Sequence, residues 1–329
     1  MTDLKRRLLV LVGVAISFAA LYLVLQSIDL GEAVDVVTTA DPLPLLTVVG
    51  VVGVQVVVRA FRWSLLLPKV EGKRIHWARL APPLLVGYLG NAVLPARLGE
   101  PMRAVIVARR ERVGMPEALA SVLLERVVDV ATLAPVAFAA ALLANAPAWA
   151  TQVLGVIAAG GLVILAILTT VGVMPLVRLM DRLGLASRPV IRGVIARFSA
   201  ILGGPSRRLA VLSAAGISVA SWFLDAGSVW LVASSVGVEL DYPAAMLIAG
   251  VGTLGTAIPS APGYVGTYEL AVAGIAGALG VPPAQSFAIA ILVHVMTLGP
   301  VAIGGAISVV GIGANLGEVA HAAEASGHD

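Results

Sequence analysis

Residues 90–103 read GNAVLPARLGEPMR and lie between two strongly apolar parts of the chain. The segment holds two prolines, two glycines and three charged side chains, Arg97, Glu100 and Arg103. A continuous membrane helix does not tolerate that mixture, because proline removes a backbone hydrogen bond and each charge is costly in lipid. Irregular, charged backbone at membrane depth persists only where protein buries it or where it lines a water-filled cavity. The segment therefore predicts a break in a membrane helix that has a functional use.

The composition predicts an all-α polytopic membrane protein. Of the 329 residues, 59% are hydrophobic and 12% are charged, whereas a soluble domain carries about 25% charged residues. The chain has no cysteine, which excludes disulfides, thiolate metal ligands and cysteine nucleophiles. It also has no P-loop, no G-x-S-x-G or H-E-x-x-H motif and no His-rich cluster. We expect no metal, no cofactor and no nucleic-acid partner.

Several apolar runs are long enough to span a bilayer, which takes about 20 residues. The first run resembles a signal peptide, but no A-x-A site follows it, so we expect a retained helix. Basic residues gather after alternate runs, and the positive-inside rule places those loops and both termini in the cytoplasm of a cell-membrane protein. The loops at 29–41, 145–150 and 237–241 carry no Lys or Arg and belong on the outer side. The predicted full spans are 8–25, 43–67, 116–143, 153–173, 209–236 and 283–310.

The sides assigned to these loops agree with the number of membrane crossings only if residues 80–107 enter and leave on the cytoplasmic side and residues 244–279 enter and leave on the outer side. Both are therefore predicted re-entrant hairpins. The second contains its own break, LGTAIPSAPGYVGTYE at 254–269, and we expect the two breaks to form one site. Two helix–hairpin–helix units of inverted topology result, as in secondary transporters. The alternative is eight continuous helices with proline kinks.

The predicted single transmembrane domain, 1–329, divides into five parts. They are an N-terminal helix and outer loop (1–42), repeat one (43–144, hairpin 80–107), a connecting helix and cytoplasmic amphipathic segment (151–208), repeat two (209–312, hairpin 244–279) and a disordered tail (313–329).

In the first hairpin, Asn91 and Pro95 are expected to end one half-helix and Gly99 to permit a tight turn. The N-terminus of the next half-helix, flanked by Arg97 and Arg103, could hold a phosphate. Glu100 would neutralise an arginine or take up a proton. Alternatively, the two arginines are juxtamembrane residues paired with Glu100.

The helix that follows carries Glu125 and Asp129 on one face, with Arg126 about 100° round from Glu125. These charges must face partners rather than lipid. One interpretation is a charge relay opposite Arg97 and Arg103, and the other is a network that only fixes helix packing.

The second hairpin offers backbone dipoles, hydroxyls and the carboxylate of Glu269, with Pro262, Gly263 and Gly266 shaping its turn. We expect this hairpin either to line the outer half of the substrate pathway or only to seal the outer face of the protein. Asp225 and His294 are candidate coupling groups within helices, unless Ser221 or Ser228 binds Asp225. Arg59 and Arg62 are interpreted as snorkelling anchors at the cytoplasmic surface.

Three segments carry a resemblance to a known family: LPARLGEPMRA, ALASVLLERVVDV and PSAPGYVGTYE. Together they resemble the membrane region of the bacterial lysylphosphatidylglycerol synthase/flippase (multiple peptide resistance factor) and the flippase-like membrane proteins related to it. The resemblance implies inverted re-entrant hairpins around a cavity that handles phospholipid or polyprenyl-phosphate-linked headgroups. The matching positions are Asn91, Pro95, Arg97, Gly99, Glu100, Arg103, Glu125, Arg126, Asp129, Pro262, Gly263, Gly266 and Glu269.

The chain also departs from that family. The synthase members add a soluble aminoacyl-transferase domain after the membrane region, whereas this sequence ends at Asp329, so lipid aminoacylation is not expected. Relatives often have Gly-Gly at Gly263-Tyr264, and many have an arginine in the last helix, where this chain has His294.

These patterns predict a lipid flippase for an anionic phospholipid or a polyprenyl-phosphate-linked headgroup, with Arg97, Arg103 and Arg126 holding the phosphate. One alternative is an intramembrane transferase that acts on lipid-linked sugars, with Glu100 or Asp129 as general base. Another is a non-catalytic membrane subunit of a lipid synthase. The expected partners are a membrane lipid and either a second copy of the chain or a synthase or glycosyltransferase.

Overall fold

The computed structural model describes residues 3–26, 28–94, 97–171, 182 and 205–313. The amphipathic part expected within 151–208 and nearly all of the tail 313–329 lie outside these residues, as does Pro95. The described part is helical, with one isolated β-bridge between Val70 and Lys73. Its elements are α1 (Asp3–Leu25), α2 (Leu30–Thr38), α3 (Pro42–Leu66), α4 (Trp77–Val93), α5 (Gly99–Glu111), α6 (Met115–Leu143), α7 (Ala148–Ala166), the π-helical turn η2 (Ile167–Val171), α10 (Pro205–Ser235), α11 (Tyr242–Gly255), the 3₁₀ turn η4 (Pro262–Tyr264), α12 (Thr267–Ala278) and α13 (Pro283–Ile312).

Five helices are long and apolar enough to cross a membrane: α3, α6, α7 with its continuation, α10 and α13. A sixth span exists if α1 and α2, which meet at an angle of 90°, are counted together. The prediction of an all-α polytopic membrane protein is therefore confirmed. Most helix ends lie within a few residues of the predicted ones, because proline and aspartate mark the starts of α3, α11 and α13.

The outer loop predicted at 29–41 is wrong, because most of it is the helix α2. The carboxylate of Asp29 caps this helix, accepting hydrogen bonds from the backbone N–H groups of Gly31 (2.8 Å) and Glu32 (3.2 Å). Asp41 caps α3 in the same way, through the N–H of Leu43 at 2.9 Å. Two of the acidic residues in this segment, Asp29 and Asp41, are therefore helix caps.

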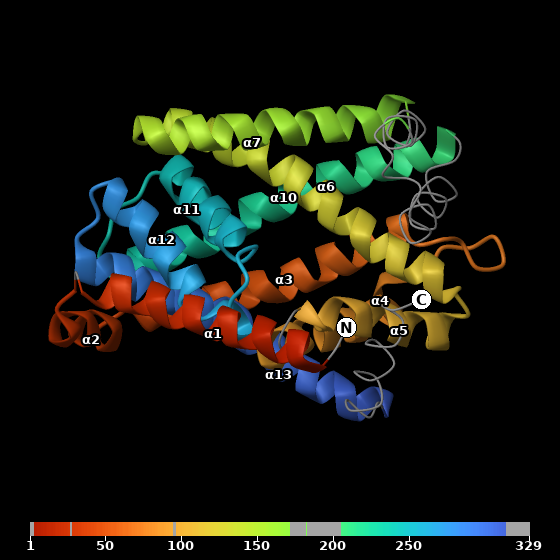
Figure 1. Cartoon of the computed structure of the whole chain (residues 1–329), viewed down its shortest axis with the longest axis horizontal. Coiled ribbons are helices and arrows are strands. Elements are labelled where there is room, and N and C mark those ends of the chain that lie inside the picture. The colour runs from red at the N-terminus through yellow and green to blue at the C-terminus, as the bar shows by residue number, and fades with distance from the viewer. Residues whose placement is uncertain (1–2, 27, 95–96, 172–181, 183–204, 314–329) are drawn as a thin grey trace.

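Two pairs of short helices lie among the spans. The members α4, α5, α11 and α12 have 17, 13, 14 and 12 residues. Those lengths correspond to about 18–26 Å, short of the roughly 30 Å hydrocarbon core of a bilayer. The two helices of each pair pack against each other. Figure 1 shows α4 and α5 toward one end of the molecule's long axis and α11 and α12 toward the other.

Close backbone contact holds α4 against α5. A Cβ at Gly99 would overlap the carbonyl oxygen of Gly87 and the amide of Asn91. Asn91 also fixes the pair, since its Oδ1 accepts the N–H of Gly99 at 3.0 Å. The tight-turn role predicted for Gly99 is therefore wrong: Gly99 permits close packing, and the left-handed backbone falls on Arg97 (φ 55°).

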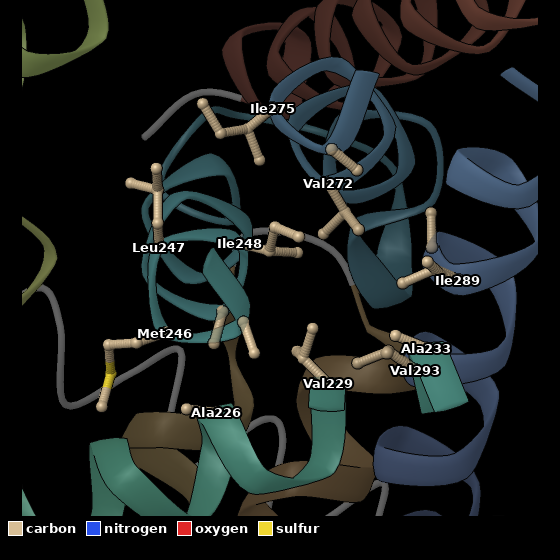
Figure 2. Packing of buried hydrophobic residues seen from close by; sticks show 14 of the residues in the cluster. Ala226, Val229, Ala233, Met246, Leu247, Ile248, Val272, Ile275, Ile289 and Val293 are labelled. Atoms are coloured by element: carbon tan, nitrogen blue, oxygen red, sulfur yellow. The ribbon is translucent and has the colours of Figure 1, made fainter. Parts of the chain in front are cut away.

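The second pair is embedded in the largest hydrophobic cluster. Figure 2 shows Ile248 of α11 and Val272 of α12 packed among side chains of α10 and α13, including Val229 and Ile289. Helix α1 covers the break between α11 and α12, where Ser17 Oγ accepts the backbone N–H of Ala261 at 2.7 Å. The second pair is thus packed against the spans α10 and α13, and α1 covers its break.

Candidate functional site

The two breaks contact each other through Arg97. Its guanidinium donates a hydrogen bond to the carbonyl oxygen of Thr256, just beyond the end of α11. The same guanidinium lies 5.3 Å from the ring centroid of Tyr264, a cation–π distance. Arg97 therefore does not pair with Glu100, as the juxtamembrane alternative supposed. It joins the ends of two helix pairs that are distant in sequence.

A cavity of about 210 Å³ lies beside this junction. That volume corresponds to about seven liquid waters, which suits a small headgroup. The wall draws on α3, α4, α6, α10, α11, η4, α12 and α13. Its polar and aromatic lining includes Gln55, Arg59, Tyr88, Arg126, Trp222, Asp225, Thr253, Thr256, Tyr264, Tyr268, His294 and Thr297.

Arg126 is a cationic wall residue with unused hydrogen-bond donors. Its Nε lies 3.5 Å from Glu100, and its Nη2 lies 3.6 Å from both Glu125 and Asp129. A charge-assisted hydrogen bond is about 2.7–2.9 Å long, and Arg126 makes no side-chain hydrogen bond to any described residue. The side chain is 34% exposed. Three carboxylates thus hold Arg126 in place without occupying its N–H groups.

Behind the cavity wall lies a buried ion network centred on Arg62. This side chain is 2% exposed and donates to Glu125 (2.6 Å), to Asp129 and to the hydroxyl of Ser218 (2.7 Å). Arg62 of α3 therefore joins α6 to α10. Its interpretation as a snorkelling anchor is wrong, because the carboxylates that neutralise it lie inside the protein.

Arg103 belongs to the same network. Its Nη1 lies 2.9 Å from Glu125, and its guanidinium lies 4.7 Å from the ring of Trp63. Of the two arginines predicted to lie opposite these carboxylates, Arg103 contacts Glu125, whereas Arg97 contacts Thr256 and Tyr264. Because Arg103 is buried and does not line the cavity, it positions Glu125 rather than reaching a ligand there.

Asp225 lies in the cavity wall as an ion pair with Arg59 at 2.8 Å, and it also accepts from Gln55 Nε2 at 2.9 Å. The anchor interpretation of Arg59 is likewise wrong. Ser221 and Ser228 do not bind Asp225, since their hydroxyls donate to carbonyls of their own helix. The sequence did contain a signal for these ion pairs: two arginines lie three residues apart in an apolar helix, and intramembrane charges require partners.

Glu269 contacts His294, which lines the cavity. Glu269 Oε2 accepts the N–H of Gly266 at 2.6 Å, and Oε1 lies 2.5 Å from His294 Nδ1. The turn before Glu269 requires glycine, because Gly263 and Gly266 have φ of 71° and 89°. Pro262 begins the 3₁₀ turn there. Within the described ranges, no group of three or more His, Asp or Glu residues could hold a metal ion.

Comparison with known proteins identifies the family. A family model described as the lysylphosphatidylglycerol synthase TM region matches residues 10–305. "Glycosyltransferase AglD" of Haloferax volcanii is 27% identical over 95% of this chain and 56% of its own length. A "UPF0104 membrane protein" of Methanothermobacter thermautotrophicus is 32% identical over 38% of this chain and 36% of its own length. The matches thus cover about half of one relative and about a third of the other. With its apolar spanning helices and a match over most of its length, the chain is a multi-pass integral membrane protein that belongs to the family of the lysylphosphatidylglycerol synthase TM region.

Proposed function

We propose that this protein is a flippase of the cell membrane that binds the phosphate of an anionic lipid in the cavity beside Arg97 and Arg126. The observation that carries the proposal is Arg126, a cavity-lining guanidinium held by three carboxylates at 3.5–3.6 Å and without a side-chain hydrogen bond to any residue that the structure describes. A planar guanidinium presents paired donors that match phosphate oxygens. The ligand is an anionic phospholipid or a polyprenyl-phosphate-linked headgroup.

The surroundings of Arg126 favour a phosphate over a bare carboxylate ligand. Arg59 contributes a second guanidinium to the same wall, and Arg97 lies at its edge beside Thr256 and Tyr264. Donors that approach from several elements suit a tetrahedral anion with several oxygen atoms. Threonine and tyrosine hydroxyls in the wall could bind the remaining oxygens of a headgroup.

The short helix pairs support a transport mechanism. Their lengths and their positions toward opposite ends of the molecule fit two re-entrant hairpins of inverted topology. In transporters of this kind, one repeat rocks against the other around a fixed site. The contact of Arg97 with Thr256 and Tyr264 joins the two hairpins at that site, so rocking would make and break it.

Lipid transfer in liposomes tests the proposal. Vesicles of phosphatidylcholine and phosphatidylglycerol would hold the purified protein and fluorescent phosphatidylglycerol, or a fluorescent polyprenyl-phosphate sugar, as probes. Arg126→Gln, Arg97→Ala and Glu100→Gln should each lower the initial transfer rate of an accepted probe by about tenfold or more, equivalent to roughly 1.4 kcal/mol of lost stabilisation. Arg109→Gln, at an exposed residue in the last turn of α5, is the control. Unchanged transfer in both arginine variants would contradict the site.

The second candidate function is an intramembrane transferase for lipid-linked sugars. One observation favours it: the relative that aligns with 95% of this chain is named a glycosyltransferase. Glu100 or Asp129, both beside Arg126, would serve as general base toward a bound acceptor. Purified protein given a polyprenyl-phosphate sugar and an acceptor lipid distinguishes the two functions. A new glycosylated product supports the transferase, whereas movement of intact lipid without a product supports the flippase.

A further inference from the structure

The charged side chains around the cavity balance one another. The described residues place five guanidiniums and five carboxylates in the wall and directly behind it. They are Arg59, Arg62, Arg97, Arg103 and Arg126, and Glu100, Glu125, Asp129, Asp225 and Glu269. A lipid phosphodiester carries one negative charge. Its entry into this neutral site would leave a net negative charge away from water, which is unfavourable.

His294 is a wall residue outside these ion pairs of arginine with carboxylate, and a proton on it would change this balance. Its Nδ1 faces Glu269 Oε1 at 2.5 Å, and the other oxygen of Glu269 accepts the N–H of Gly266. An ionised Glu269 accepts the shared proton from Nδ1. The second ring nitrogen, Nε2, has no hydrogen bond to a described residue and can take up another proton. An imidazole with a proton on both ring nitrogens carries one positive charge.

We propose that the cavity binds a proton together with each lipid phosphodiester, and that His294 is the proton site. The inference rests on the proposed function. Protonation of His294 gives the wall one net positive charge, and the phosphodiester then restores neutrality. Release of the lipid on the other side of the membrane favours release of the proton, so a proton gradient would drive transfer.

The groups that face His294 from the neighbouring helices are consistent with this role. From α12 come Glu269 and Tyr268, whose ring lies 4.7 Å from the imidazole. The same cavity is lined by Arg59 of α3, Asp225 of α10, Tyr88 of α4 and Arg126 of α6, together with Tyr264 of η4. The arginines have carboxylate partners, so they do not preclude a proton on the imidazole. Helix α2 also packs on α13, but its Glu32 and Asp35 are exposed.

Proton uptake on ligand binding tests the inference. The probe is short-chain dihexanoyl phosphatidylglycerol, titrated calorimetrically into the purified full chain at neutral pH in buffers of different ionisation enthalpy. The dependence of heat on buffer gives the number of protons taken up per lipid bound, and we expect up to about one for the unaltered chain. Because this is a binding measurement, it does not depend on transport.

Two variants and a control sharpen the result. His294→Asn keeps an amide donor near the position of Nδ1 but cannot titrate, so proton uptake should fall to zero and lipid should bind at least several-fold more weakly. Glu269→Gln makes the wall positive without a proton, so lipid should bind with little proton uptake. His76→Asn is the matched control, since His76 is an exposed helix cap that asparagine can replace.

Two outcomes would overturn the inference while leaving the phosphate site intact: lipid binding to the unaltered chain without proton uptake, or unchanged uptake in His294→Asn. No binding of the probe to any form would instead count against the proposed function, and the inference would fall with it.

Discussion

Arg62 shows how one residue organises three membrane helices. Its guanidinium reaches Glu125 and Asp129 of α6 and Ser218 of α10, while its own backbone belongs to α3. Two buried carboxylates beside each other are unfavourable unless cations compensate them. Arg62 and Arg103 supply that compensation behind the wall, which lets Glu125 and Asp129 hold Arg126 at the cavity. The cavity's geometry therefore depends on residues that do not line it.

We predict that Arg62→Met strongly destabilises the protein. The substitution keeps most of the side-chain volume but leaves two buried carboxylates short of a cation, a type of change that costs about 3–5 kcal/mol. Chemical unfolding in detergent micelles measures the effect. Arg109→Met, at an exposed position, is the control and should change stability by no more than about 0.5 kcal/mol. A loss for Arg62→Met no larger than that of the control would contradict the network.

At the scale of the helices, the arrangement of the first pair depends on close packing between α4 and α5. Gly87, Gly90 and Gly99 allow the two backbones to meet, and a side chain at any of them would press on the other helix. The packing places Glu100, in the first turn of α5, within reach of Arg126 on α6. The geometry of this short pair therefore influences the position of the proposed phosphate ligand.

We predict that Gly99→Ala lowers both stability and lipid transfer. The added methyl group would overlap the Gly87 carbonyl oxygen, and such overpacking costs about 1–3 kcal/mol. Gly160→Ala is a matched control, because Gly160 of α7 has no atom within 4 Å of a built Cβ. Alanine there should be neutral or stabilising by up to about 1 kcal/mol. Thermal unfolding in micelles compares the two, and equal midpoints would show that α4 and α5 are not held this closely.

The sequence predicted these elements well where a local signal existed. Apolar runs predicted the spans, and the prolines and glycines near residues 95–99 and 259–266 predicted both breaks. Helix α2 was missed although Asp29 and Glu32 have the spacing of a capping box. Arg59 and Arg62 were misread because their partners, Asp225, Glu125 and Asp129, lie more than 60 positions away in the chain. The rotation of a helix about its axis, which decides such pairings, is set by tertiary packing rather than by local pattern.

At the scale of the whole molecule, two broken helix pairs meet beside a cavity whose charged groups are balanced. Arg97 lies at their junction, the ion pairs of α3, α5, α6 and α10 surround it, and α1 covers the second break. The sequence placed Glu125, Arg126 and Asp129 on the correct helix and grouped the two breaks together. It did not reveal the aromatic side of the cavity, because Tyr88, Trp222, Tyr264 and Tyr268 come from four elements and share no motif.

The central claim is that this cavity holds a lipid phosphate through Arg126. Mass spectrometry of the lipids that copurify with the full chain in mild detergent tests it most directly. The account predicts that a phosphate-containing anionic lipid copurifies with the unaltered protein and with Arg109→Gln, and that Arg126→Gln, purified in the same way, loses most of it. The same amount of the same lipid on Arg126→Gln, or no phosphate-containing lipid on the unaltered protein, would contradict the account.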